Sequence, residues 1–239
     1  MEFSFLIGDQ EFEIPQVIDL ELFQRAMAWD ISDVQNHVPF VATILGCSPS
    51  VIQSFNPELF ELALGVCVSR IAFEDREPLR ELHGHSLKSF NDLTFGDFMD
   101  LDLLVTQSAT TNAIDIICKL YDISFEEAST IPANEAWPTI DAFIKWRAYT
   151  YKEYGEFFET DRMEDDEPIE PIDHSIGQLQ LMWYEAVLAL ANHEFLNIHK
   201  VVNRPYREAL NFLTWKKNEI AKQKLQNLKR KHDIQRSTR

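Results

Sequence analysis

Hydrophobic residues recur at helical spacing along most of this chain. Leu59, Leu62 and Val66 form one such stripe, and similar stripes run through most of residues 19–220. Asn56 precedes Pro57, and this pair is typical of an N-cap followed by the first position of a helix. The pattern predicts a mainly α fold with a bundle-like body of packed helices.

Further start and stop signals divide this helical pattern into segments. We predict N-caps at Asp19, Thr94 and Ser124, with Asp97 as the N3 partner of Thr94. Gly46 is predicted to end a helix by adopting a left-handed conformation. These signals mark where the expected helices begin and end.

The first residues follow a different pattern. Phe12 and Ile14 alternate with acidic residues, and the turn-forming pair Gly8–Asp9 separates this run from the β-prone residues 3–7. We predict a short N-terminal β-hairpin that ends at Pro15. The chain has only seven glycines, which argues against a large all-β fold with many tight turns. We expect this hairpin to be the only sheet.

Eight aromatic residues lie within residues 137–158, arranged in two helical stripes. One stripe consists of Ile140, Phe143, Arg147, Tyr151, Tyr154 and Phe158, and the other of Trp146, Tyr149, Glu153 and Phe157. A helix with two apolar stripes is expected to bury two sides. Alternatively, the second stripe binds a partner protein through Trp146, Tyr149 and Phe157.

Residues 159–173 interrupt the helical pattern with eight acidic residues and two prolines. This composition predicts an exposed linker. We therefore expect three parts: a hairpin and helical body over residues 1–158, the linker over 159–173, and a C-terminal helical lobe over 174–239. The lobe should contain a helix around Trp183 and a final helix that begins near Pro205, with its apolar face at Leu210, Leu213 and Ile220.

Charge is distributed unevenly along the chain. Residues 216–239 contain nine Lys or Arg residues and two acidic residues, a net charge of +7, whereas residues 1–215 contain 13 basic and 37 acidic residues, a net charge of −24. We predict an acidic body with a projecting cationic helix. The predicted partner-binding cations are Lys216, Lys217, Lys222, Lys224, Lys229, Arg230 and Lys231.

Three interpretations of this cationic segment remain open. It is a solvated helix end, a docking element for an acidic or groove-bearing protein, or a contact for nucleic acid or a membrane surface. The acidic body and the lack of aromatic residues among the C-terminal cations argue against a nucleic-acid partner. No apolar run approaches the roughly 20 residues of a membrane span, and the first residues lack the pattern of a secretory signal.

Residues that could support chemistry are few. Cys47, Cys67 and Cys118 lie among apolar residues and are interpreted as buried thiols. The segment His83–His85 is interpreted as an exposed loop, since no third ligand occurs at a metal-binding spacing. Asp97, Asp100 and Asp102 are candidates for catalytic carboxylates, but we interpret them as acids stabilised by a nearby helix N-terminus. We predict no enzyme activity, catalytic residue, cofactor or metal.

Three segments resemble tail and baseplate assembly proteins of tailed bacteriophages, including baseplate-hub assembly proteins of T-even-like phages and tail assembly chaperones. They are the hairpin sequence FLIGDQEFEIP at residues 5–15 with the helical residues 19–30 after it, the phrase LTFGDFMDLD at 93–102, and the C-terminal pattern of WYEA at 183–186, EALNFL at 208–213 and a Lys-rich helix.

The resemblance implies a non-enzymatic assembly factor that holds a tail hub, baseplate or tape-measure protein in the host cytoplasm. It implies no cofactor and no catalytic residue. The alternatives are a structural subunit retained in the virion tail, a regulatory nucleic-acid-binding module that uses the basic helix, and self-association of this chain. An enzyme ranks below these.

Overall fold

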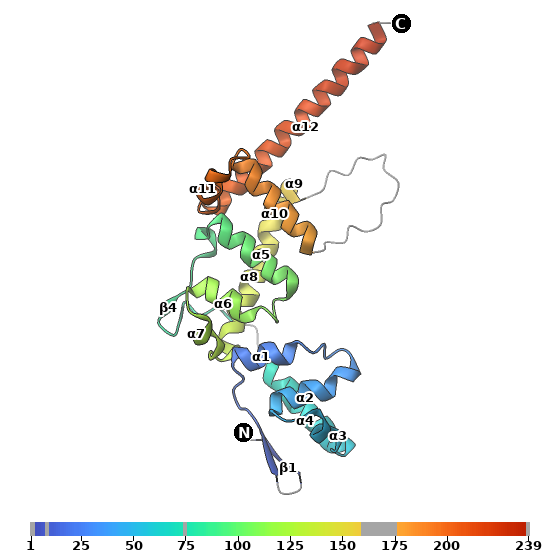
Figure 1. The fold of residues 1–239 in the computed structure, drawn as a ribbon, viewed down its shortest axis with the longest axis vertical. Coiled ribbons are helices and arrows are strands. Elements are labelled where there is room, and N and C mark those ends of the chain that lie inside the picture. The colour runs from blue at the N-terminus through green and yellow to red at the C-terminus, as the bar shows by residue number, and fades with distance from the viewer. Residues whose placement is uncertain (1–2, 8–9, 74–75, 159–175, 238–239) are drawn as a thin grey trace. The chain divides into compact units, whose positions relative to one another are not determined.

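The computed structural model describes residues 3–7, 10–73, 76–158 and 176–237 of the 239-residue chain. These residues form twelve α-helices and two short antiparallel strand pairs, so the predicted mainly α fold is confirmed (Figure 1). The α-helices are α1 (Leu20–Met27), α2 (His37–Leu45), α3 (Pro49–Gln53), α4 (Pro57–Ile71), α5 (Phe95–Ser108), α6 (Ala113–Tyr121), α7 (Phe125–Ser129), α8 (Ala133–Glu153), α9 (Gly155–Phe158), α10 (Ile176–Leu190), α11 (Ile198–Val202) and α12 (Tyr206–Ser237).

The remaining elements are strands and single turns of 3₁₀ helix. They are β1 (Phe3–Ile7), β2 (Gln10–Ile14), β3 (Glu81–Leu82), β4 (His85–Ser86), η1 (Val34–Asn36), η2 (Phe90–Asp92) and η3 (Phe195–Asn197).

The chain divides into two compact units, each of which is discontinuous in sequence. Unit 1 comprises Met1–Lys88 and Leu104–Lys145, and unit 2 comprises Ser89–Leu103 and Trp146–Arg239. Helices α5 and α8 therefore contribute residues to both units. The predicted linker at 159–173 lies outside the described residues, and the three-part division of the chain stays a prediction.

Unit 1 contains both strand pairs. β1 pairs with β2 as predicted, with Phe5 opposite Phe12 and both side chains buried, whereas the expected turn at residues 8–9 lies outside the described residues. The expectation of a single sheet is wrong, because β3 pairs with β4. His83 and Gly84 join these strands with positive φ angles of 50° and 85°, as a two-residue hairpin turn requires.

The predicted helix caps are present. The side chains of Asp19, Asn56, Thr94 and Ser124 each accept a hydrogen bond from the backbone N–H three residues later, at 2.8–3.2 Å. Gly46 ends α2 in the left-handed region at φ 65°. Each capping side chain accepts from a backbone N–H group of the first helical turn that would otherwise lack a partner. Residue types able to do so are therefore a reliable signal of a helix start in the sequence.

The core of unit 1 combines aliphatic residues of α1, α2 and α6 with aromatic rings. The ring of Phe23 lies 5.3 Å from the rings of both Phe73 and Trp137. Tyr121 is also buried, and its hydroxyl group lies 2.8 Å from the hydroxyl of Thr139. Cys67 is buried and Cys47 and Cys118 are half-buried, all three as free thiols.

In unit 2, the beginnings of α5 and α12 are joined by backbone hydrogen bonds. The Phe95 N–H donates to the Arg204 carbonyl at 2.7 Å, and the Tyr206 N–H donates to the Leu93 carbonyl at 3.1 Å. At the next residue of α5, a side chain at Gly96 would place its Cβ 3.2 Å from the Val202 carbonyl oxygen. Glycine at this position therefore permits the close approach of α5 to α11.

Aromatic rings fill the centre of unit 2. The ring of Phe98 on α5 stacks on Tyr206 of α12 at 5.2 Å and meets Trp146 and Trp183 edge-on at 5.9 and 5.7 Å. Such edge-to-face pairs add about 0.5–1.5 kcal/mol each beyond area burial. We call Phe90, Phe95, Phe98, Trp146, Phe157, Phe158, Trp183 and Tyr206 the aromatic core of unit 2.

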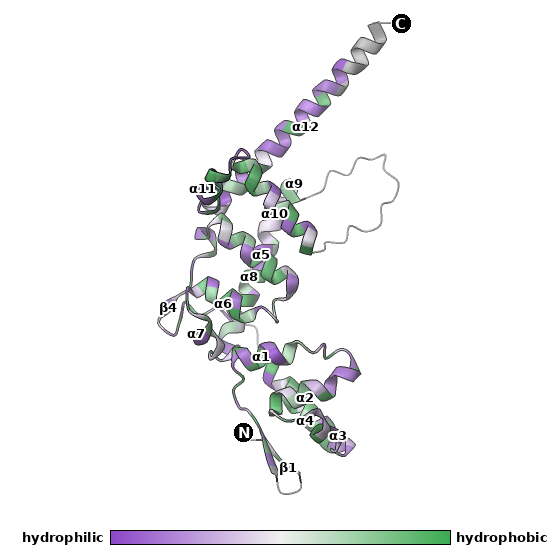
Figure 2. Ribbon diagram, viewed as in Figure 1, coloured by the Kyte–Doolittle hydropathy of each residue, from purple (hydrophilic) through white to green (hydrophobic). Residues whose placement is uncertain are grey.

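Helix α12 leaves this core after its second turn. Leu210 and Leu213 are buried as predicted, but Ile220 is 45% exposed, so its expected inward position is wrong. Within residues 221–230, every side chain that the structure describes is exposed. Figure 2 shows this part of α12 as mostly hydrophilic. Ile220 continues the apolar stripe by spacing, but the helix has passed the body by that point.

Candidate functional site

The predicted cations begin where α12 leaves the aromatic core. Lys216 is half-buried, and its ammonium group donates a hydrogen bond to the Ala189 carbonyl of α10 at 3.1 Å. Lys217 is also half-buried. These two residues therefore belong to the base of the helix, where Lys216 ties α12 to α10.

The next cations extend from the helix. Lys222 pairs with Glu219 on the same helix at 3.0 Å, and both side chains reach solvent. Lys224, Lys229 and Arg230 are exposed, and Lys231 lies in the same helix. Exposed pairs within one helix are worth only a few tenths of a kcal/mol, so this arrangement contributes little to folding and leaves positive charge available to a partner.

Of the three aromatic residues of the predicted partner-binding stripe, two belong to the aromatic core and one is exposed. Trp146 packs against Phe90, Phe98 and Tyr206 within the aromatic core. Phe157 packs on Trp183 at 6.1 Å. Tyr149 is 63% exposed. Of these residues, Tyr149 is the one whose ring is open to a partner in this arrangement, and the binding role of the stripe stays a prediction.

A groove lies between the end of α10, α11 and the first turns of α12. Its volume is about 390 Å³, and its lining is mainly apolar with a few charged residues. We call it the α10–α12 groove, and it is lined by Leu190, Ala191, Asn192, Asn197, Lys200, Val201, Arg204, Glu208, Ala209 and Phe212. Phe212 also contacts the ring of Trp215 at 5.5 Å, and Trp215 is 57% exposed.

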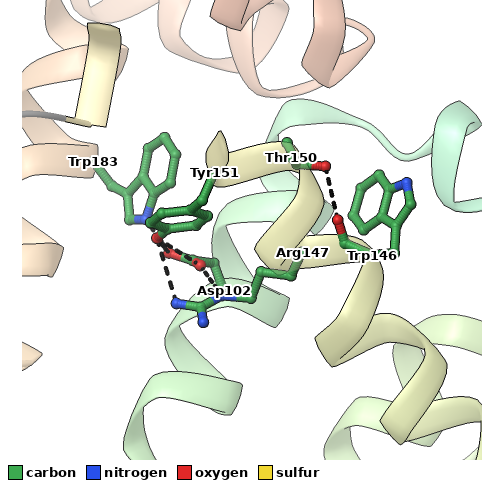
Figure 3. A network of polar contacts seen from close by, with 6 residues as sticks. All are labelled: Asp102, Trp146, Arg147, Thr150, Tyr151 and Trp183. Carbon is green, nitrogen blue, oxygen red and sulfur yellow. Dashed lines mark hydrogen bonds and ion pairs between the residues drawn. The ribbon is translucent and has the colours of Figure 1, made fainter. Parts of the chain in front are cut away.

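A second concentration of polar groups is buried inside unit 2. Asp102 of α5 is fully buried and accepts hydrogen bonds from Arg147 and Tyr151 of α8 and from Trp183 of α10 (Figure 3). The Tyr151 hydroxyl lies 2.8 and 2.9 Å from the two carboxylate oxygens, and the Trp183 indole nitrogen lies 2.8 Å from Oδ2. The interpretation of Asp102 as an acid stabilised by a helix N-terminus gave no indication of this burial or of these three donors.

The electrostatics of this cluster keep Tyr151 and Arg147 in their protonated states. Burial and then the negative charge of Asp102 raise the pKa of Tyr151, so the phenol stays protonated and donates. Burial alone would lower the pKa of Arg147, but the charge of Asp102 and the phenol group of Tyr151 raise it, so the guanidinium stays charged. Arg147 also lies 4.7 Å from the centre of the Tyr151 ring.

This cluster has the features of a structural element. Both carboxylate oxygens of Asp102 are occupied by donors from two other helices, which leaves no open position for a substrate. Among the described residues, no group of three or more His, Cys, Asp or Glu could hold a metal ion. His85 lies 3.8 Å from Glu127, and His83 is exposed.

Comparisons of this chain with protein-family models, with curated proteins and with solved structures found no match. Within the described parts of the chain, no helix combines the length and the hydropathy needed to cross a membrane. The surface of unit 2 carries two features suited to binding, namely the cationic part of α12 and the apolar groove at its base.

Proposed function

We propose that this protein is a non-enzymatic assembly factor for a phage tail or baseplate. In this proposal it binds a tail hub, baseplate or tape-measure protein through helix α12. The observation that carries the proposal is the exposure of every described side chain over residues 221–230, in a helix whose preceding turns are anchored in the core. A cationic helix with so little contact to its own body is suited to contact another molecule.

The charge distribution supports a protein partner. The +7 segment is attached to a body of −24, and a body of that charge repels the phosphate backbone of nucleic acid. A precursor of a tail protein exposes apolar surface before assembly and is prone to aggregate. An acidic body would keep a complex with such a protein soluble, while the cationic helix holds its acidic surface.

The test is capture of tail proteins by the tagged full chain from phage-infected cells, followed by mass spectrometry at two salt concentrations. We expect hub, baseplate or tape-measure proteins to be recovered. A chain that ends after Ile220 should lose most of this recovery, because it lacks Lys222, Lys224, Lys229 and Arg230. This truncation keeps the Lys216 hydrogen bond to Ala189, so the body should melt at an unchanged temperature.

A full-length control separates charge from length. Substituting Lys222, Lys224, Lys229 and Arg230 with Gln keeps the helix but removes four positive charges, and it should weaken capture by at least tenfold. Recovery of nucleic acid that washes off steeply with salt, without tail proteins, would support the nucleic-acid-binding module instead. Equal capture by the native, truncated and Gln-substituted chains would contradict the proposal.

A further inference from the structure

The base of α12 combines an apolar groove with positive charge, and neither feature is explained by folding alone. The small side chains of Ala191 and Ala209 leave space between Val201 and Phe212. The walls of the groove are helices and their connections, so the groove offers no strand edge to a partner. This geometry fits the binding of a helix by its apolar face.

Large apolar side chains next to the groove are exposed. Trp215 extends the apolar surface one turn along α12 from Phe212, which it contacts. Phe195 and Leu196 are 82% and 86% exposed in the turn that leads to Asn197, which lines the groove. Exposed aromatic residues beside an apolar depression are typical of the anchor points of protein interfaces.

Charge indicates which kind of helix would bind. Lys200 and Arg204 line the groove, and the one acidic residue of its lining, Glu208, lies 3.8 Å from Arg204. Lys216, Lys217, Lys222 and Lys224 continue the positive charge along α12. From Phe212 to Arg230 the helix extends about 27 Å at 1.5 Å per residue. By helical spacing Lys216 and Arg230 lie on the same side of α12 as Phe212, with Glu219 between them, so the positive charge that faces a helix in the groove is concentrated at Lys200, Arg204 and Lys216.

We propose that the α10–α12 groove binds an amphipathic helix that carries acidic residues beside its apolar stripe. Two or three apolar side chains of the partner fill the groove against Val201 and Phe212, and its acidic residues face Lys200, Arg204 and the cations of α12. This inference rests on the proposed function, because it assigns the groove and α12 to the same partner.

The test uses three fluorescein-labelled peptides of 21 residues and the full-length chain. The first peptide has Leu and Phe at positions i, i+3, i+4 and i+7 with Glu on both sides of this stripe. The second has Lys in place of Glu, and the third has the composition of the first in an order that destroys the stripe. By fluorescence anisotropy we expect the first peptide to bind with micromolar affinity and the other two at least tenfold more weakly.

Variants of the chain locate the binding. Phe212→Ala should weaken binding of the first peptide at least tenfold, and Lys200→Glu should weaken it at least threefold. The matched control is Tyr184→Ala, since Tyr184 is an exposed aromatic residue of α10 that does not line the groove, and it should leave the affinity unchanged. Circular dichroism checks that each variant is folded.

Several results would overturn the inference. Equal binding of the striped and the reordered peptide would show that charge alone is recognised. Unchanged affinity in Phe212→Ala, or an equal loss in Tyr184→Ala, would place the contact elsewhere. A dimer in sedimentation velocity that Phe212→Ala dissociates would show that a second copy of this chain occupies the groove.

The inference and the proposed function can fail separately. If Phe212→Ala captures tail proteins from infected cells as well as the native chain does, while truncation after Ile220 abolishes capture, the groove inference fails and the function stands. If the striped peptide binds as expected but no tail protein is captured, the assembly function fails and the groove assignment stands.

Discussion

Trp183 donates its indole N–H to the buried carboxylate of Asp102 at 2.8 Å, although 81 residues separate them in the sequence. The same carboxylate accepts hydrogen bonds from Arg147 and Tyr151. One acidic side chain thus connects three helices, α5, α8 and α10, inside unit 2. Buried charges of this kind are tolerated only when they are paired and fully hydrogen-bonded.

Replacing Asp102 with Ala should destabilise the protein by about 3–5 kcal/mol, because it leaves the mostly buried guanidinium of Arg147 without its counter-ion. The measurement is the free energy of unfolding from urea titration, followed by tryptophan fluorescence. The control is Asp100→Ala, an exposed position on the same helix, for which we expect a change below about 1 kcal/mol. Similar values for both variants would contradict a structural role for the cluster.

Tyr151 should make stability fall at high pH. Its pKa in the folded protein is raised above the ordinary value of about 10, first by burial and then by Asp102. The unfolded chain therefore releases this proton first, so the contribution is complete below about pH 10 and decreases as pH rises further. Tyr151→Phe should be less stable at pH 7, since it loses the hydrogen bonds to Asp102.

The same variant should show a flatter loss of stability above pH 10. Urea titrations at pH 7, 9, 10 and 11 provide the comparison. Tyr121 and Tyr154 also have raised pKa values, with burial as the first cause, so part of the alkaline loss should remain in the variant. Parallel pH profiles for the native chain and Tyr151→Phe would refute the contribution of Tyr151.

Trp146→Ala and Tyr149→Ala should have different effects. Trp146 belongs to the aromatic core, so its removal should cost about 3 kcal/mol and lower the melting temperature clearly. Tyr149 is exposed, and Tyr149→Ala should change stability by about 0.5 kcal/mol or less. If Trp146→Ala instead melts like the native chain and loses only partner capture, the ring has a binding role that its packing does not indicate.

Cys67 should react with thiol reagents at least tenfold more slowly than Cys47 and Cys118 at pH 8. Burial, followed by the proximity of Cys47, raises the pKa of Cys67 to about 12, so the reactive thiolate is scarce. Timed labelling with iodoacetamide and peptide mass spectrometry would give the three rates, with labelling in 6 M guanidinium chloride as the control. Equal rates in the native protein would contradict the burial of this thiol.

Local signals in the sequence were sufficient to predict much of the fold. The caps at Asn56 and Thr94 and the left-handed Gly46 depend only on neighbouring residues, and each has the predicted conformation. The strands β3 and β4 have two residues each, too few to produce an alternating pattern. Their turn at His83 and Gly84 could be recognised only through the backbone angles.

Features that depend on tertiary packing were not predictable in this way. The partners of Asp102 lie 45 to 81 residues away, and nothing in the helix that contains it marks it as buried. The α10–α12 groove likewise exists only once three helices are packed together, and the one local sign of it is the spacing of Phe212 and Trp215. The cationic run, in contrast, was evident from composition alone.

Because of the hydrogen bonds between residues 93–95 and residues 204–206, unit 2 can be completed only late in synthesis. All residues of unit 1 have been synthesised once the ribosome has added Lys145. The first turn of α5, in contrast, has its hydrogen-bond partners only after the chain has been extended to Tyr206. Synthesis of the chain from Phe95 to Tyr206 takes about 6–22 s at 5–20 residues per second. During that time Phe95 lacks Trp183 and Phe98 lacks Tyr206, so a chain released before α12 would expose aromatic rings of an incomplete unit 2 and be prone to aggregate.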